Sequence, residues 1–268
     1  PPEANVGSYL LTRKEVILMS EKQILATRTG KEIYREGEKV VKSFDPAAYP
    51  KSDILNEALN QARAEDLGLN VPRLLDVDVS GERYTITVEF IEGKTLAQLW
   101  AENPDKEEEY LNLFVDLQLE IQSKRNPLMN KIKDKMNRKI DQTDLDPSTR
   151  YELHTRLDGM PKRDKVCHGD FNPSNINITP EGVPYVLDWA HVTRGNGSAD
   201  AARTYLLFSL EGKDELAKKY LQLYSRKSGT ALQYIQQWMP IVAASQSVKG
   251  NAEEREFLMR WVDVVEWV

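Results

Sequence analysis

Four polar side chains suited to metal binding and proton transfer lie within one short segment of the chain. The segment Val166–Trp189 reads VCHGDFNPSNINITPEGVPYVLDW and contains His168, Asp170, Asn175 and Asp188. Turn-forming residues separate short apolar runs, which predicts a strand–loop–strand hairpin with these side chains at one end of a small sheet. One carboxylate beside an attacking hydroxyl, with an amide and a second carboxylate on Mg²⁺, is what magnesium-dependent phosphoryl transfer needs.

This segment resembles the catalytic loop of the aminoglycoside phosphotransferase/choline kinase family. The family pattern is HGD, four residues, Asn, and then an apolar strand that ends in Asp-Trp; the match is His168-Gly169-Asp170, Asn175 and Asp188-Trp189. HGD alone is a weak signal, but the three parts at these spacings are specific. The alternative is an Asx-rich hairpin whose side chains only cap turns. Turn capping does not explain a carboxylate at the end of an apolar strand, so phosphoryl transfer is favoured.

The resemblance implies a role for each residue of the segment. Asp170 would be the catalytic base that accepts the proton of the acceptor hydroxyl. Asn175 and Asp188 would hold Mg²⁺. His168 would brace the catalytic loop by hydrogen bonding, as it does in the family, and Trp189 is expected to pack.

Two residues downstream extend the resemblance. Asp200 is similar to a family aspartate that supports the catalytic loop; it could equally be the N-cap of a helix predicted over 201–210, and the two roles are compatible. Arg203, one turn later, fits a structural partner of a loop carboxylate as well as a ligand contact.

The beginning of the chain predicts strands. Residues 22–44 read as a β-hairpin with turns at Gly30 and Gly37, followed by a helix with its N-cap at Ser52. In kinase folds a strand lysine binds the α- and β-phosphates and pairs with a glutamate on the next helix, and Lys42 and Glu57 have this order. The alternative for Lys42 is an edge-strand lysine that points to solvent.

The nucleotide-binding residues expected from the resemblance include two further pairs. The first hairpin lacks the G-x-G-x-x-G of protein kinases, so Thr29 and Gly30 would cover the phosphates with fewer free N–H groups. Strands are predicted over 74–79 and 84–91. Glu89 and Ile91 would form the hinge that hydrogen-bonds adenine, although a strand that runs into a glycine turn explains them equally well.

From Thr95 onward the pattern is mostly helical, with helices predicted over 110–121, 128–140, 148–157, 199–210, 214–224, 231–244 and 253–268. The expected class is α+β: a two-lobed protein-kinase-like fold with an N-terminal five-stranded antiparallel sheet plus one helix, and a mostly helical C-terminal lobe with a catalytic β-hairpin. The expected domains are a leader or disordered tail over 1–18, a nucleotide-binding lobe over 19–92, and a catalytic and substrate-binding lobe over 93–268.

Composition narrows the class of function. The 268 residues are 40% hydrophobic and 29% charged, as in soluble globular proteins. A net charge of −6 argues against bulk nucleic-acid binding and is compatible with a cationic acceptor. No apolar run approaches a membrane span, no signal peptide is visible, and one cysteine, Cys167, suits a reducing compartment. A cytoplasmic protein that uses ATP and Mg²⁺ is expected.

Three hypotheses for function follow. The first is an ATP-dependent kinase of a small aminoglycoside-, choline- or sugar-like molecule, since the Ala-Pro-Glu segment of protein kinases is missing. The second is a catalytically silent nucleotide-binding protein, against which the complete set of catalytic residues counts. The third is a metal-dependent hydrolase that uses His168, Asp170, Asp188 and His191, although three histidines are few for two metals. Candidate acceptor contacts are Trp238, Glu254, Trp261, Asp263 and Glu266.

Overall fold

The computed structural model describes residues 22–248 and 252–262. This part of the chain forms two compact units, which we call unit 1 (residues 22–59 and 72–91) and unit 2 (residues 60–71 and those from Glu92 onward). The chain enters unit 2 for the second time at Glu92. Residues 60–71, which the sequence places in the N-terminal lobe, belong to unit 2 because Ala64, Leu67 and Val71 pack into its core.

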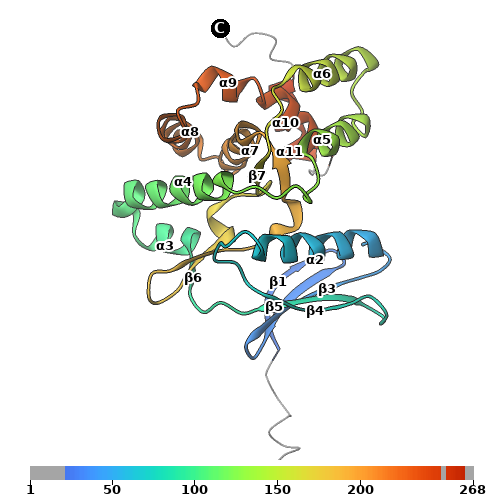
Figure 1. The fold of residues 1–268 in the computed structure, drawn as a ribbon, viewed down its shortest axis with the longest axis vertical. Helices are drawn as coiled ribbons and strands as arrows, with labels where there is room; N and C mark the ends of the chain where they lie inside the picture. Colours follow the sequence, from blue (N-terminus) through green and yellow to red (C-terminus); the bar gives the residue numbers. More distant parts are fainter. Residues whose placement is uncertain (1–21, 249–251, 263–268) are drawn as a thin grey trace, which may run out of the picture. The chain divides into compact units, whose positions relative to one another are not determined.

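Unit 1 contains the five-stranded antiparallel sheet predicted from the alternation of residues, with the strand order β1-β2-β3-β5-β4 (Figure 1). Gly30 and Gly37 form the first two turns with φ of +72° and +60°, values that glycine adopts at little cost. The strands are β1 (Gln23–Arg28), β2 (Lys31–Glu36), β3 (Lys39–Phe44), β4 (Leu74–Asp78) and β5 (Tyr84–Glu89).

Strand β3 lies in the middle of this sheet and contains Lys42. Lys42 is opposite Ile33 on β2 and Ile86 on β5, so the strand is paired along both edges. Its side chain is 12% exposed. The alternative of an edge-strand lysine that points to solvent is therefore wrong.

Helix α2 (Lys51–Glu65) follows β3 and packs on the sheet through one apolar side. Residues four apart share a helix face, and the buried cluster of unit 1 accordingly combines two helical with three strand residues: Ile54, Ala58, Phe44, Ile86 and Val88. The helix begins at Lys51, so Ser52 lies inside its first turn and is not the N-cap that the sequence predicted.

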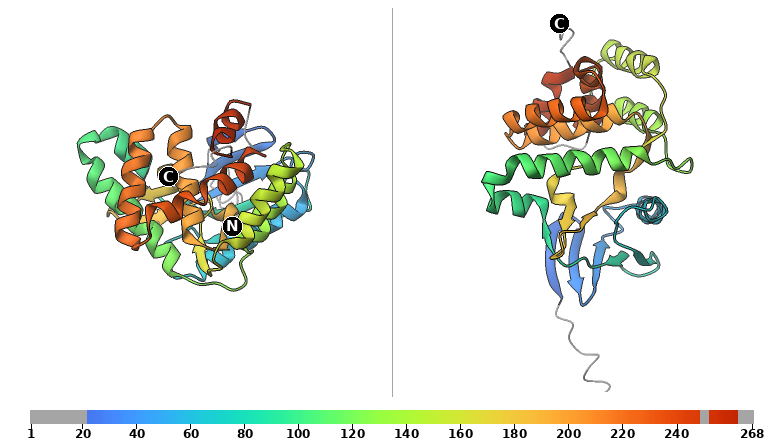
Figure 2. Two further views of the ribbon diagram at one scale, coloured as in Figure 1. Left: turned by 90° about the horizontal axis from the view of Figure 1, so that it is seen from above. Right: turned by 60° about the vertical axis from the view of Figure 1, so that its left-hand side comes forward.

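Unit 2 is mostly helical, as expected. Its helices are α3 (Leu96–Glu102), α4 (Glu107–Ser123), α5 (Ile132–Asp141), α6 (Pro147–Gly159), α7 (Gly197–Leu210), α8 (Asp214–Ser228), α9 (Leu232–Gln236), α10 (Met239–Ser247) and α11 (Ala252–Val262). Two small sheets complete it, one of β6 (Lys94–Thr95), β8 (Ile176–Ile178) and β9 (Pro184–Val186), the other of β7 (Lys165–Cys167) and β10 (Thr193–Gly195). The long helix α4 lies beside α8 in both views of Figure 2.

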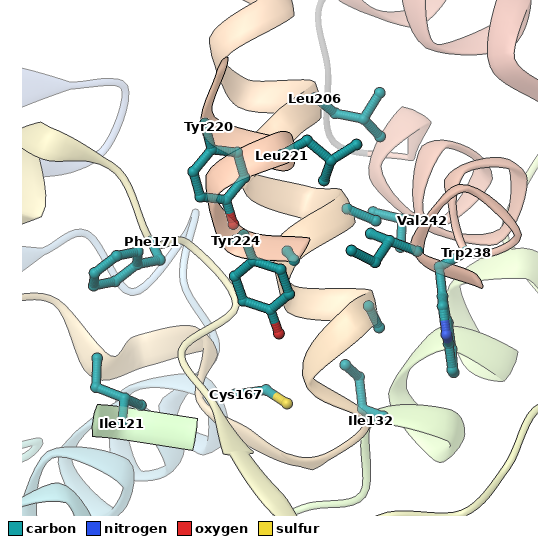
Figure 3. Close-up of a cluster of buried hydrophobic side chains, with 14 of the residues drawn as sticks. Ile121, Ile132, Cys167, Phe171, Leu206, Tyr220, Leu221, Tyr224, Trp238 and Val242 are labelled. Atoms are coloured by element: carbon teal, nitrogen blue, oxygen red, sulfur yellow. The ribbon is translucent and has the colours of Figure 1, made fainter. Parts of the chain in front are cut away.

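The core of unit 2 anchors the segment Val166–Trp189 at two points. Phe171 and Trp189 have no exposed surface, and Phe171 stacks on Phe114 of α4 at 4.6 Å between ring centroids. Figure 3 shows Tyr220 and Tyr224 of α8 with Phe171 and Cys167 around them. Burial of each such large side chain stabilises a fold by about 1.5–3 kcal/mol. The segment between Phe171 and Trp189 is therefore held at both ends by the core.

Two helix predictions need correction. The single helix predicted over 231–244 is two helices, α9 and α10, because Pro240 lies in the first turn of α10 and has no N–H to continue the preceding helix. The helix predicted over 253–268 is seen as α11 up to Val262; Asp263, Glu266 and the predicted leader over 1–18 lie outside the described residues. None of the described helices is both long enough and apolar enough to cross a membrane.

Candidate active site

The β8–β9 hairpin of unit 2 places Asn175 and Asp188 at the same end of a small sheet. Ile176 pairs with Val186, so the residues just outside this pair, Asn175 and Leu187, are neighbours. The N–H of Leu187 donates to the carbonyl of Asn175 at 2.8 Å. Asp188 follows directly, as the strand–loop–strand pattern predicted.

Asp170 is held from two directions. Nδ2 of Asn175 donates to the main-chain oxygen of Asp170 at 2.9 Å and to its Oδ2 at 3.2 Å. Arg203 of α7 lies 3.4 Å from Oδ1, so this arginine is the partner of a loop carboxylate. Burial lowers the pKa of Arg203, and the charges of Asp170 and Glu254 act in the opposite direction. Asp170 keeps 27% of its side chain exposed, so its carboxylate is both positioned and accessible.

His168 braces the loop, as expected. It is fully buried, and both of its ring nitrogens contact the main chain. Nδ1 accepts from the N–H of Asp170 at 3.3 Å, which leaves the ring proton on Nε2, 3.0 Å from the carbonyl of Leu187. Through these two contacts His168 joins the two arms of the hairpin.

Asp200 fixes the backbone of the HGD triplet from within the core. Its side chain is 1% exposed. Oδ1 accepts from the N–H of Gly169 at 2.8 Å, and Oδ2 accepts from the N–H of His168 at 3.3 Å. Helix α7 begins earlier than predicted, with Asn196 as its N-cap. The N-cap interpretation of Asp200 is therefore wrong, and the supporting interpretation describes its contacts.

Two glutamines of α4 support Asp200, and the sequence reasoning missed them. Nε2 of Gln118 and Nε2 of Gln122 donate to Oδ2 of Asp200 at 3.4 and 3.3 Å. Tyr220 and Tyr224 of α8 donate their hydroxyl protons to these glutamines at 2.5 and 2.6 Å. Burial raises the pKa of both tyrosines, so the hydroxyls remain donors. The sign of this contact in the sequence was a pair of glutamines four residues apart on the apolar face of a predicted helix.

Gly169 has a conformation that other residues rarely adopt. Its φ is +82°, and a Cβ there would lie 2.5 Å from the carbonyl oxygen of His191. That distance is too short for a non-bonded contact with a backbone atom. The middle residue of HGD must therefore be glycine in this fold.

Asp188 has φ of +58°, and among the described residues it is the one non-glycine with positive φ. Aspartate and asparagine enter this region more readily than other side chains, and such strain gathers at functional sites. Since Nδ2 of Asn175 faces Asp170, the amide oxygen of Asn175 is the atom suited to a cation. An amide, a carboxylate and substrate phosphates form a donor set that fits Mg²⁺.

The described residues contain no group of three or more His, Cys, Asp and Glu that could hold a metal. A hydrolase with two metals would need a larger set of protein ligands.

In unit 1, Lys42 and Glu57 meet as predicted, with 2.7 Å between Nζ and Oε1. The turn at Thr29 and Gly30 joins β1 to β2. Glu89 ends β5, and its N–H donates to the carbonyl of Arg73 at 2.9 Å. A hydrogen bond from the Arg73 side chain lowers the pKa of Glu89. Contacts of these residues with a nucleotide, and of Ile91 with adenine, stay predictions.

A cavity of about 340 Å³ in unit 2 borders Gly169, the middle residue of the HGD triplet. Its lining includes Gly169, His191 and Arg203 together with Glu254, one of the acceptor contacts suggested by the sequence. The other two described candidates lie elsewhere. Trp238 is fully buried at the edge of a different cavity, and Trp261 packs edge-on against Tyr205.

Solved structures of small-molecule kinases have the same fold. Aminoglycoside phosphotransferase APH(4)-Ia matches with a TM-score of 0.67 and 15% identity over 91% of this chain and 92% of that chain. Choline kinase LicA from Streptococcus pneumoniae matches with a TM-score of 0.64 and 15% identity over 94% and 96%. An aminoglycoside-3'-phosphotransferase of type VIII matches with a TM-score of 0.62 and 16% identity over 84% and 93%.

No curated protein gives a significant match to the chain. The model of the phosphotransferase enzyme family, in contrast, matches residues 27–238, which include Lys42, Glu57 and the whole segment Val166–Trp189. The match spans well over half of the sequence and agrees with the two-lobed, kinase-like architecture. The chain therefore belongs to the phosphotransferase enzyme family, the aminoglycoside phosphotransferase/choline kinase group of small-molecule kinases.

Proposed function

We propose that this protein transfers the γ-phosphoryl group of ATP to a hydroxyl group of a small molecule, with Asp170 as the catalytic base. The contacts and the exposure of the Asp170 carboxylate support this proposal most strongly. This carboxylate is oriented by Asn175 and Arg203 and remains partly exposed, and the preceding residue, Gly169, lines a cavity. A carboxylate that is positioned and accessible in this way can accept a proton from an alcohol that reaches it.

The proposed reaction follows from that position. Asp170 accepts the hydroxyl proton while the acceptor oxygen forms a bond to the γ-phosphorus, and the bond from that phosphorus to the β–γ bridging oxygen breaks to release ADP. Asn175 and Asp188 would hold Mg²⁺, which neutralises charge on the phosphates when it is bound. Because Asp200 fixes the backbone N–H groups of His168 and Gly169, the base keeps its orientation throughout.

The residues of unit 1 would bind the nucleotide. Lys42, held by Glu57, is the proposed ligand of the α- and β-phosphates, and the turn at Thr29 and Gly30 would cover them. Glu89 through its carbonyl and Ile91 through its N–H would contact adenine. Nucleotide complexes of similar proteins support this part, since APH(4)-Ia was solved with ADP and with AMP-PNP, and LicA with AMP.

The acceptor is proposed to be a small, amine-bearing alcohol. The cavity beside Gly169 is at the lower end of the 300–1,000 Å³ typical of small-molecule sites, which suits a metabolite or antibiotic better than a protein. Its lining carries both signs of charge, so an ammonium group on the acceptor would have to pair with one of the two carboxylates among the charged residues Glu211, Glu254, Lys135, Lys139 and Arg203. Similar proteins act on or bind such molecules: LicA is a choline kinase, and APH(4)-Ia was solved with hygromycin B.

A phosphoryl-transfer screen tests the proposal. The protein would be incubated with ATP, Mg²⁺ and single acceptors from three groups, namely amine-bearing alcohols, neutral sugars and hydroxyl-containing peptides, with ADP release as the readout. We expect release with at least one small alcohol and none with peptides. Phosphorylation of peptides alone, or nucleotide binding without transfer to any alcohol, would contradict the proposal.

A titration of nucleotide binding against Mg²⁺ concentration tests the proposed metal ligands. Asp188→Asn is the suitable variant because asparagine tolerates positive φ, whereas alanine would add backbone strain. We expect Asp188→Asn to need a much higher Mg²⁺ concentration for nucleotide binding, and Asn175→Ala to need a moderately higher one, since a carboxylate neutralises more charge than an amide. Unchanged magnesium dependence in Asp188→Asn would remove Asp188 from the proposed site.

A further inference from the structure

Two lysines of unit 1 approach one carboxylate oxygen from neighbouring strands. Nζ of Lys42 lies 2.7 Å from Oε1 of Glu57, and Nζ of Lys31 lies 3.8 Å from the same atom. All three side chains are largely shielded, with 12% of each lysine and 14% of Glu57 exposed. Two ammonium groups thus converge on one point of the sheet, where the family pattern predicted a single lysine–glutamate pair.

The register of the sheet explains this convergence. Lys31 is opposite Phe44, and Lys42 is opposite Ile33, so the two lysines are diagonal neighbours on the same face. Nζ of Lys31 also lies over the ring of Phe44, 4.7 Å from its centroid. Two ammonium groups beside one carboxylate leave this point of the sheet with an excess of positive charge, which suits an anionic ligand.

The turn before Lys31 is fixed against the segment that follows β3. The carbonyl of Gly30 accepts from the N–H of Asp45 at 2.7 Å and from Arg83 at 3.3 Å. A Cβ at Gly30 would lie 2.7 Å from Cβ of Ala48. A turn with one glycine and these contacts has few N–H groups to offer a phosphate chain. A cationic side chain directly after the turn can replace them.

We propose that Lys31 is a second phosphate-binding residue, which acts beside Lys42 on the same nucleotide. The inference rests on the proposed function, because it requires that unit 1 binds ATP. When the triphosphate is bound, Lys31 exchanges its longer contact with Glu57 for a phosphate oxygen, while Lys42 keeps its short bond to the same carboxylate. Lys31 thereby does what additional backbone N–H groups do in a glycine-rich loop.

Calorimetric titration of the full chain with ATP, ADP and adenosine tests this. Lys31→Met removes the charge and keeps the length of the side chain, and Lys39→Met is the matched control, an exposed lysine of the same sheet. We expect Lys31→Met to lose about tenfold in affinity for ATP and ADP, as for one charge-assisted hydrogen bond. Affinity for adenosine should not change, Lys31→Arg should restore most of the loss, and Lys39→Met should bind like the wild type.

A second comparison distinguishes direct binding of phosphate by Lys31 from an indirect effect of Lys31 through Glu57. If Lys31 contacts phosphate itself, Lys31→Met should weaken ATP binding further in a Lys42→Met background. No further loss there would mean that Lys31 acts only through the Lys42–Glu57 pair, and would overturn the inference. Equal ATP affinity of the wild type and Lys31→Met would overturn it while leaving the proposed function intact. A wild type that binds no nucleotide would overturn both.

Discussion

The carboxylates of Glu57 in unit 1 and Asp200 in unit 2 both hold a functional residue, but they hold different kinds of group. Glu57 is 14% exposed and contacts the ammonium groups of two long side chains. Asp200 is 1% exposed and accepts hydrogen bonds from backbone N–H groups and side-chain amides. An ion pair tolerates small displacements, whereas a set of hydrogen bonds from fixed donors does not. Unit 1 thus positions a movable side chain, and unit 2 fixes a backbone.

The two carboxylates also differ in the size of the buried core of the unit to which each belongs. The buried cluster of unit 1 has five members, so a substitution there disturbs few neighbours. Asp200 lies within the extensive core around α4, α7 and α8, next to fully buried aromatic rings. Changes near Glu57 should therefore mainly affect ligand binding, and changes near Asp200 should affect stability as well.

The largest effect is expected at Asp170, which follows the backbone N–H groups that Asp200 holds in unit 2. Asp170→Ala should lower kcat by about 10²–10⁴-fold, as for the loss of a general base, with ATP affinity and melting temperature nearly unchanged. Steady-state kinetics, nucleotide titration and thermal unfolding would measure the three quantities. A fall in kcat of less than about tenfold, or roughly 1.4 kcal/mol, would mean that Asp170 is not the base.

The comparison itself can be tested with one conservative substitution in each unit. Asp200→Asn should reduce the free energy of unfolding by about 1–3 kcal/mol, because an amide would turn a donor toward buried donors. Glu57→Gln should reduce it by less, because the flexible ammonium groups of its partners can turn toward water, and should in addition raise the KM for ATP. Denaturant unfolding and kinetics of both variants decide. Equal losses of stability would show that the two carboxylates do the same work.

In unit 1, Lys42 and Glu57 should affect nucleotide binding as one coupled pair. Lys42→Ala should raise the KM for ATP, and Glu57→Gln should raise it by a smaller factor through misplacement of the lysine. The combined variant should be non-additive in kcat/KM, since residues in contact are coupled. Fully additive losses in this double-mutant cycle would mean that the two side chains act on the nucleotide independently.

The smallest effect concerns Cys167, which precedes His168 and has no exposed surface. Burial raises the pKa of its thiol well above the usual value. An exposed thiol reacts much faster at pH 9 than at pH 7 because the thiolate forms, but Cys167 should stay unreactive toward a thiol reagent at both. Asp200→Asn should accelerate its labelling, and Glu57→Gln should not. Rapid labelling of the wild-type protein would contradict the tight fixation of this segment.

The sequence predicted most of the candidate site because its residues are close along the chain. His168, Asp170, Asn175 and Asp188 fall within one hairpin, so turn residues and alternation were sufficient to bring them together. Lys42 and Glu57 lie on consecutive elements, and the order of a strand and a helix was sufficient for that pair.

Contacts between distant segments could not be predicted in the same way. Gln118 and Gln122 meet Asp200 only because α4 and α7 pack together, and their polarity at a buried helix face was the one local sign. Lys31 was not recognised because its proximity to Lys42 depends on strand register rather than on a motif. The separation of α9 from α10 could not be predicted from the apolar spacing over 231–244, which favours one helix; the missing N–H of Pro240 was the local sign of it.

The cramped position of Gly169 limits how this catalytic loop can change over evolutionary time. With φ of +82° and the carbonyl of His191 in the space where a Cβ would be, every single-residue replacement there collides with a neighbouring loop. A library randomised at residue 169 alone and selected for activity should return glycine. A descendant with a side chain there could arise only through an altered path of the chain around residue 191.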